Sequence, residues 1–243
     1  MSAGASLTVE GLSKSFRGLR AVHDVGFAVP GSAIYSLIGP NGAGKTTIFN
    51  MIAGVFAPDR GQVTLDGMRL DGMRPDQICA AGVGRTFQIV RPFPALTVLQ
   101  NVIVGALHRH ASVPEARARA EQILASLGMD DRRETLASSL TLPDRKRLEV
   151  ARALATDPKL LLLDEVMAGL RPTETDQMVG FLREINARTG VTILLIEHVM
   201  RAVMALSQHV VVVHHGEKIA EGTPQQVVRD KAVLDVYLGT EAH

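Results

Sequence analysis

The feature that most restricts the fold of this chain is a glycine-rich loop at residues 39–47, with the sequence GPNGAGKTT. It follows an apolar run at residues 33–38 and leads into residues 48–53, a strand-and-helix context that suits a phosphate-binding loop with the spacing G-x-x-x-x-G-K-[ST]. Glycines permit backbone conformations in which successive N–H groups converge on phosphate oxygens, beside the positive end of the following helix. An ordinary glycine-rich turn is the alternative, and the flanking strand and helix argue against it. We therefore expect a nucleotide site formed by Gly39, Pro40, Asn41, Gly42, Ala43, Gly44, Lys45, Thr46 and Thr47.

Two side chains of the loop and two later carboxylates predict the chemistry of this site. Lys45 is expected to reach the β- and γ-phosphates, and the Thr46 hydroxyl is expected to bind Mg²⁺. Asp164 follows an apolar run at residues 160–163 and is placed to hold Mg²⁺ through water, while Glu165 is aimed at the γ-phosphate, where a carboxylate polarises an attacking water. Two acidic residues at the end of a strand are, in about half of all cases, only a solvated strand end or a helix cap. The catalytic interpretation is favoured here because the pair lies downstream of the phosphate loop in the same kind of sheet.

Three other side chains are candidates for the same site. His198 follows another apolar run and is placed to hydrogen-bond a γ-phosphate oxygen, with a capping or core histidine as the alternative. Gln88 ends a short strand before a proline-containing segment, so its amide is placed to join the Mg²⁺ shell; a plain loop glutamine is an equal alternative. Phe16 lies upstream of the phosphate loop, where it would stack on a base, although an aromatic residue there is more often core.

Composition limits the class of protein. The chain has 243 residues, 46% of them apolar and 21% charged, which is ordinary for a soluble globular protein. A formal net charge of +1 gives no indication of nucleic-acid binding. The single cysteine, Cys79, excludes an internal disulfide and fits a reducing compartment. The N-terminus has no signal-peptide pattern, and no apolar stretch has the length of a spanning helix. If the protein works at a membrane, another chain is expected to hold it there.

The pattern of short apolar runs and helical segments predicts a parallel sheet covered on both faces. Strands are expected at residues 33–38, 83–86, 160–164, 191–196 and 210–214, and helices at residues 173–188 and 199–207. Alternating apolar residues and an Asp66-Gly67 turn add antiparallel strands at residues 7–9, 25–29, 62–65 and 68–70. The predicted fold class is therefore α/β, with an antiparallel β subdomain.

Helical signals replace strand signals from residue 91 to residue 154. Capping boxes at Ser112-x-x-Glu115 and Thr141-x-x-Asp144 start two helices there. A last helix is expected to start at Thr223. We therefore predict one domain over residues 1–243, with a core from residues 1–90 and 155–243 and a helical subdomain at residues 91–154.

The order of these motifs resembles that in ATP-binding subunits of ABC transporters, and the resemblance covers residues 7–238. Within that superfamily, several stretches are similar to the branched-chain (hydrophobic) amino-acid uptake group. They are GRTFQ at 84–88, LEVARALA at 148–155, AGLRP at 168–172, IEH at 196–198, GTP at 222–224 and VYLG at 236–239.

The resemblance implies a RecA-like P-loop NTPase core with an inserted helical subdomain, and ATP sandwiched between two such chains. It implies that Glu165 is the catalytic base, with His198 and Lys45 at the γ-phosphate, and that Gln88 links Mg²⁺ to the membrane subunits. It also places Phe16 on the adenine, Val22 in the nucleotide site and Thr141 against the nucleotide of the partner chain. The implied partners are a second ATPase subunit, permease subunits and, through them, a periplasmic binding protein, with the ATPase on the cytoplasmic face of the plasma (inner) membrane.

The signature segment departs from the family pattern, since residues 140–144 read LTLPD where Leu-Ser-Gly-Gly-Gln is usual. Thr141 keeps a hydroxyl, whereas Pro143 has no N–H to donate and Asp144 brings negative charge toward a phosphate, which the following Arg145, Lys146 and Arg147 are expected to offset. We therefore predict a weakened contact to the partner's nucleotide. Val166 and Arg171 also differ from the usual proline and aspartate or asparagine.

The leading functional hypothesis is the ATPase of an importer for branched-chain amino acids or related small molecules. One alternative is the ATPase of a lipopolysaccharide-type exporter, and another is a nucleotide-sensing module with weak hydrolysis. Repair and translation ATPases of this superfamily carry long coiled-coil inserts or tandem domains, for which this chain has no room. The resemblance to the branched-chain uptake group favours a heterodimer of two different ATPase subunits. The sequence alone does not decide between this heterodimer and a homodimer.

Overall fold

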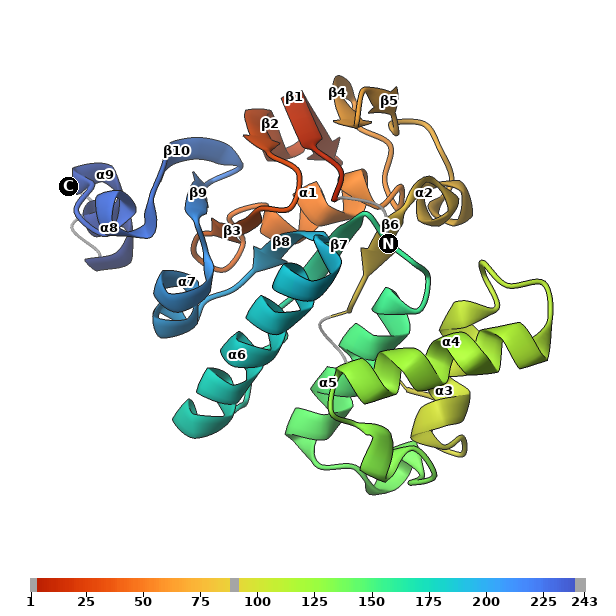
Figure 1. Ribbon diagram of the computed structural model, residues 1–243. Helices are drawn as coiled ribbons and strands as arrows, with labels where there is room; N and C mark the ends of the chain where they lie inside the picture. Colours follow the sequence, from red (N-terminus) through yellow and green to blue (C-terminus); the bar gives the residue numbers. More distant parts are fainter. Residues whose placement is uncertain (1–3, 88–91, 239–243) are drawn as a thin grey trace.

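The computed structural model describes residues 4–87 and 92–238, which form two sheets and a group of helices (Figure 1). The larger sheet has six strands, and five of them run parallel. From one edge to the other they are β10 (Glu217–Gly222), β9 (His209–His214), β3 (Ile34–Ile38), β8 (Thr192–Ile196), β7 (Leu160–Asp164) and β6 (Val83–Arg85). Only β10 is antiparallel, paired with β9 through the turn at Gly216. All five strands that were predicted to be parallel are present in this one sheet.

A smaller antiparallel sheet packs over the phosphate-loop side of the core (Figure 1). Its strands are, in order, β2 (Leu19–Val29), β1 (Leu7–Phe16), β4 (Arg60–Leu65) and β5 (Met68–Arg69). The first strand runs well beyond the predicted residues 7–9, because its polar second half continues to pair with β2 after shifts in register. The predicted hairpin around Asp66-Gly67 is present.

The helices divide between the core and an insert. α1 (Lys45–Ile52), α2 (Pro75–Ala81), α6 (Pro172–Thr189), α7 (Met200–Leu206), α8 (Pro224–Val227) and α9 (Lys231–Leu238) belong to the core. α3 (Val98–Ala106), α4 (Val113–Ser126) and α5 (Leu142–Leu154), with the short 3₁₀ turns η1 (Asp130–Arg132) and η2 (Ala137–Ser139), form a separate helical group beside α6 (Figure 1). This group occupies the segment that was predicted to be a helical subdomain.

Alternate side chains of the buried strands enter two different cores. In β7, Leu161 and Leu163 pack among α3 to α7, whereas Leu160 and Leu162 pack among α1 and the antiparallel sheet. Strands buried on both faces are continuous apolar runs, and this explains the four leucines before Asp164. The predicted coverage of both faces is confirmed.

Two helical details differ from the sequence prediction. The helix that begins at Thr223 lasts one turn, and α9 restarts after Asp230, whose carboxylate accepts the N–H of Ala232 at 2.8 Å. α2 was not predicted, although it has proline at its first position and Gly82 in a left-handed conformation after its end. Among the helices of the described chain, none combines the length and apolarity needed to cross a bilayer.

Candidate nucleotide-binding and hydrolysis site

The site residues lie together because they follow the carboxyl ends of neighbouring parallel strands. Leu37 of β3 and Asp164 of β7 both pair with Ile196 of β8, so these three strands end at the same level. The phosphate loop, the Asp164-Glu165 pair and the Glu197-His198 pair therefore emerge at one edge of the sheet (Figure 1). Ligands of open α/β sheets bind at this edge.

The phosphate loop holds a conformation that only glycine accepts at two of its positions. Gly44 has φ +101°, and a Cβ there would lie 2.6 Å from the carbonyl oxygen of Ala21. Gly39 has φ +154°, and its Cβ would lie 2.1 Å from the carbonyl oxygen of Val213. The loop thus packs its backbone against β2 and β9, and α1 begins directly after Gly44.

Lys45 is 7% exposed, and its ammonium donates to the carbonyl oxygens of Gly39 at 2.7 Å and Pro40 at 2.8 Å. Its side chain therefore folds back over the loop, and its charge lies against the carbonyl oxygens of the loop. Burial lowers the pKa of Lys45, while the carboxylates of Glu165 and Asp164 act in the opposite direction.

A cavity of about 540 Å³ opens over this loop. Its wall includes Asn41, Lys45, Thr46 and Thr47 from the loop and Glu165 from the far side. The backbone of a glycine-rich loop, a lysine and a helix N-terminus fit a polyphosphate, and the carboxylate of Glu165 in the same cavity fits an attacking water. The donor set therefore suits a nucleoside triphosphate.

Asp164 is 2% exposed at the end of β7, and its own N–H donates to the Thr86 hydroxyl at 3.1 Å. Its Oδ2 lies 3.4 Å from Nη2 of Arg85, and Nη1 of that arginine donates to Asn50 of α1 at 2.7 Å. Burial raises the pKa of Asp164 and lowers that of Arg85, and the charge of each opposes the shift of the other. Arg85 therefore holds the acidic strand end against α1.

Glu165 is held in a strained backbone conformation, with φ +48° in a residue other than glycine. Three contacts fix it: its N–H donates to Ile196 at 3.0 Å, and its carbonyl oxygen accepts from the ammonium of Lys146 at 2.9 Å and from Ala168 N–H at 3.1 Å. The carboxylate is thereby turned into the cavity over the phosphate loop. Its Oε1 lies 3.9 Å from Nδ1 of His198, which places these two predicted residues side by side.

Glu197 supports the loop that follows Glu165. It is fully buried, and its Oε1 accepts the N–H of Met167 at 2.9 Å, while Oε2 has no hydrogen-bond partner in the described chain. Burial raises the pKa of this carboxyl group, and the Met167 hydrogen bond opposes the shift.

The raised pKa of Glu197 gives a testable pH dependence. A carboxyl group with a raised folded pKa stabilises the fold fully below its unfolded pKa of 4.5, and this contribution is lost as the pH rises through the folded pKa. We expect wild type to gain free energy of unfolding relative to Glu197→Gln as the pH is lowered from 7 toward 4.5, since the amide does not titrate. Urea unfolding at several pH values measures this difference, with Glu121→Gln as a surface control. A difference that does not change with pH would contradict the prediction.

Two predicted nucleotide contacts, Phe16 and Val22, do not line the cavity over the phosphate loop. Phe16 is partly exposed at the end of β1, in edge-to-face contact with Phe56 at a centroid distance of 5.1 Å. Val22 is fully buried, and its Cγ2 lies 3.3 Å from where a Cβ on Gly44 would be, so it backs the phosphate loop. Gln88 lies outside the described residues.

The signature segment forms the N-terminus of α5, with Thr141 as its cap. The Thr141 hydroxyl donates to Asp144 Oδ2 at 2.5 Å, and the same carboxylate oxygen is paired with Arg132 of η1. The offset of the Asp144 charge was expected from residues 145–147, and that attribution is wrong. Arg145 donates to the Leu140 carbonyl, Lys146 points into the protein and Arg147 lies over Phe181.

Sequence reasoning missed several supporting residues. The sequence predicted a role for Lys146 only in offsetting the charge of Asp144, and it gave Arg85 and Glu197 no role of their own. His215, to which the sequence analysis gave no role, lines the cavity over the phosphate loop. A buried charge that supports another residue leaves no local pattern, so Lys146, Arg85 and Glu197 had no sequence signal.

A phosphate loop facing a strained carboxylate on a parallel sheet, with a helical subdomain inserted, defines this chain as a P-loop ATPase of the cassette type. The ABC transporter profile matches residues 22–168, and a profile of the branched-chain amino acid ATP-binding cassette transporter matches residues 217–243. The chain belongs to the ATP-binding subunits of ABC transporters, in their branched-chain amino acid group.

Similar proteins agree with this assignment. The chain is 40% identical to the high-affinity branched-chain amino acid transport ATP-binding protein LivG of Escherichia coli and 39% identical to BraF of Pseudomonas aeruginosa, covering 96% of this chain and 97% of each relative. It is 34% identical to the lipopolysaccharide export system ATP-binding protein LptB of Haemophilus influenzae, over 97% of this chain and 98% of that protein. A nucleotide-free ATP-binding cassette from an ABC transporter superposes with a TM-score of 0.88 at 29% identity, covering 96% of this chain and 98% of the other. The predicted fold class is confirmed.

Proposed function

We propose that this chain binds and hydrolyses ATP to power the import of branched-chain amino acids. The proposal rests on one observation: the phosphate loop and Glu165 both line the same cavity. The C-terminal segment of the chain also matches the branched-chain group. That segment also favours import over lipopolysaccharide export, since identity to the branched-chain relatives is 39–40%, against 34% to the exporter subunit.

Each site residue has a distinct role in this proposal. The loop backbone and Lys45 bind the β- and γ-phosphates of ATP, and Glu165 orients a water for attack on the γ-phosphorus and takes its proton. His198, 3.9 Å from Glu165, hydrogen-bonds the γ-phosphate and limits the motion of the carboxylate. Phe16 and Val22 bound the adenine side of the site. These carboxylate and histidine positions argue against a nucleotide sensor that hydrolyses poorly.

Thr46 and Asp164 would hold Mg²⁺, together with Gln88. A hydroxyl and a buried carboxylate at the end of β7 are oxygen ligands of the kind that Mg²⁺ prefers, and both line a cavity of about 770 Å³ that also contains Arg85. Bound there, the ion neutralises charge on the phosphates. Arg85, 3.4 Å from Asp164, supplies part of that charge balance.

The same cavity extends from Asp164 toward the helical subdomain, where we place the permease contact. Phe87 is 59% exposed in its wall, and Phe93, 44% exposed, packs on Arg152 nearby. Exposed apolar side chains gathered beside a polar site are typical of a protein interface. Through the permeases the chain would lie on the cytoplasmic face of the membrane, linked indirectly to a periplasmic binding protein. A second ATPase subunit would complete each ATP site with its signature segment.

Reconstitution tests the proposed function directly. The affinity-tagged chain, purified from its native cells with its associated subunits, is expected to bring down two permeases and to support ATP-dependent leucine uptake in proteoliposomes supplied with the binding protein. Recovery of lipopolysaccharide-export subunits, or ATP hydrolysis that leucine-loaded binding protein does not stimulate, would contradict it.

The altered signature gives a second prediction. Asp144 occupies the Thr141 hydroxyl and Pro143 lacks an N–H, so both changes weaken donation to a phosphate on the partner chain. We expect Pro143→Gly with Asp144→Gln to raise ATPase activity of the assembled transporter by about fivefold, since one restored hydrogen bond contributes about 1 kcal/mol. Turnover is measured as phosphate release at saturating ATP. Unchanged or lower turnover would count against a weakened contact.

A further inference from the structure

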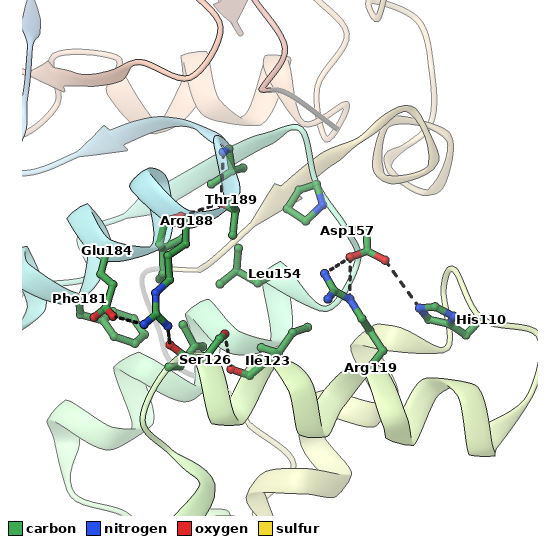
Figure 2. A pocket seen from close by; sticks show the side chains of 14 residues that line it. His110, Arg119, Ile123, Ser126, Leu154, Asp157, Phe181, Glu184, Arg188 and Thr189 are labelled. Atoms are coloured by element: carbon green, nitrogen blue, oxygen red, sulfur yellow. Dashed lines mark hydrogen bonds and ion pairs between the residues drawn. The ribbon is translucent and has the colours of Figure 1, made fainter. Parts of the chain in front are cut away.

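A third cavity of about 490 Å³ lies between α4 of the helical subdomain and α6 of the core (Figure 2). It shares no lining residue with the cavity over the phosphate loop. Its wall is mainly apolar and well buried, and includes Ile123, Leu154, Ile185 and Val191. A volume within roughly 300–1,000 Å³, apolar walls and a few polar groups are typical of small-molecule sites.

Two arginines cross this junction, one at each end of the cavity (Figure 2). Arg119 of α4 donates through Nε to Oδ1 of Asp157, in the segment before β7, at 2.9 Å. Arg188 of α6 donates to the carbonyl oxygen of Ser126 at the end of α4 at 3.0 Å, and pairs with Glu184 at 3.0 Å. The Arg119–Asp157 and Arg188–Ser126 contacts join the helical subdomain to the core, so the shape of the cavity depends on how the subdomain packs against the core.

The end near Asp157 has incomplete hydrogen bonding. Arg119 donates to Oδ1 through both Nε and Nη2, while Oδ2 faces Nε2 of His110 at 3.7 Å, too far for a hydrogen bond. That His110 nitrogen is buried and has no hydrogen-bond partner among the described residues. Asp157 also has φ +50°, a strained conformation for a residue other than glycine. A carboxylate oxygen and an imidazole nitrogen thus lie side by side at one end of a mainly apolar cavity.

The charges on the wall balance, since Arg119 and Arg188 oppose Asp157 and Glu184. A wall with separated but balanced charges favours a zwitterion over an ion of either sign. We propose that this cavity binds a free α-amino acid with a branched aliphatic side chain. The ligand's ammonium group contacts Oδ2 of Asp157, its carboxylate contacts His110 and Arg119, and its side chain packs on Ile123, Ile185 and Val191.

The assignment of a branched-chain amino acid as the ligand rests on the proposed function, because the imported amino acid is released on the side of the membrane where this subunit lies. The occupant is held between α4 and α6, and therefore restrains the subdomain that also carries α5 and the signature segment. The site would make ATP hydrolysis respond to product that has already accumulated.

Equilibrium dialysis of radiolabelled L-leucine against the purified full-length chain tests the site. We expect saturable binding that excess ATP does not displace. Ser126→Trp, which places an indole at the cavity wall, is expected to lower leucine affinity at least tenfold. Ala125→Trp, the same change on the neighbouring exposed position outside the wall, is the matched control and should bind leucine as wild type does.

Two analogues test the zwitterion. 4-Methylpentanoate lacks the ammonium group and isoamylamine lacks the carboxylate, so each should compete with leucine at least tenfold more weakly than L-isoleucine does. Absence of saturable leucine binding in a chain that binds ATP would overturn the proposal, and so would undiminished binding by Ser126→Trp or equal competition by either analogue. These measurements use the subunit alone, so they are separate from leucine uptake, whose absence would overturn the proposed function instead.

Discussion

Replacing Glu165 by glutamine is expected to lower the rate of ATP hydrolysis by at least about 100-fold while ATP binding is retained. A positioned general base contributes about 10²- to 10⁴-fold to such reactions, and the amide of glutamine cannot accept the proton of the attacking water. Glutamine preserves the size of the side chain, and the contacts that fix residue 165 use its backbone N–H and carbonyl oxygen. The variant should therefore fold as wild type does.

The measurement is phosphate release by the assembled transporter, with nucleotide affinity from a fluorescent ATP analogue on the same samples. Glu121→Gln, which changes a half-buried glutamate of α4 paired with Arg117, is the matched control and should leave both quantities unchanged. Equal rates for wild type and Glu165→Gln would refute the assignment of the catalytic base. A loss of ATP binding together with hydrolysis would also refute it, because Glu165 would then contribute to binding.

The strand-end residues were predictable because their geometry follows from local sequence. Four consecutive leucines before Asp164 indicate a strand buried on both faces, and the carboxyl ends of parallel strands meet at one edge of a sheet. The sequence alone therefore places Glu165 and His198 near the phosphate loop. Their separation of 3.9 Å agrees with that placement.

Contacts between the helical subdomain and the core could not be predicted from the sequence. The sequence has three consecutive basic residues at positions 145–147, yet only Lys146 is turned inward. The direction of its side chain depends on how α5 packs against the end of β7. Arg132 reaches Asp144 from a 3₁₀ turn whose position no periodicity indicates. The cavity between α4 and α6 depends in the same way on how these two helices pack against each other. Tertiary packing decides these features, and packing has no local sequence signal.

Lys146 is expected to have the largest effect on stability of any side chain near the site. It is 5% exposed, and its ammonium donates to the carbonyl oxygen of Glu165 at 2.9 Å. Burial lowers the pKa of Lys146, and the carboxylates of Glu197, Glu165, Glu149 and Asp164 act against that shift. Removing one partner from a buried charge cluster leaves the others uncompensated, which costs about 3 kcal/mol. We therefore expect Lys146→Met to lower the free energy of unfolding by about that amount.

The same substitution is expected to slow ATP hydrolysis about tenfold at saturating ATP with little change in ATP affinity. Lys146 does not line the cavity over the phosphate loop, but it helps to hold Glu165 at φ +48°, and a small displacement of a positioned group is costly to the rate. Lys146→Arg keeps a charged donor and should recover part of both losses. Lys218→Met, which removes a surface lysine paired with Glu221, is the matched control and should change stability by less than about 0.5 kcal/mol. Urea unfolding and phosphate release measure the two effects, and a Lys146→Met chain as stable and as active as wild type would show that the ammonium group does not position the catalytic carboxylate.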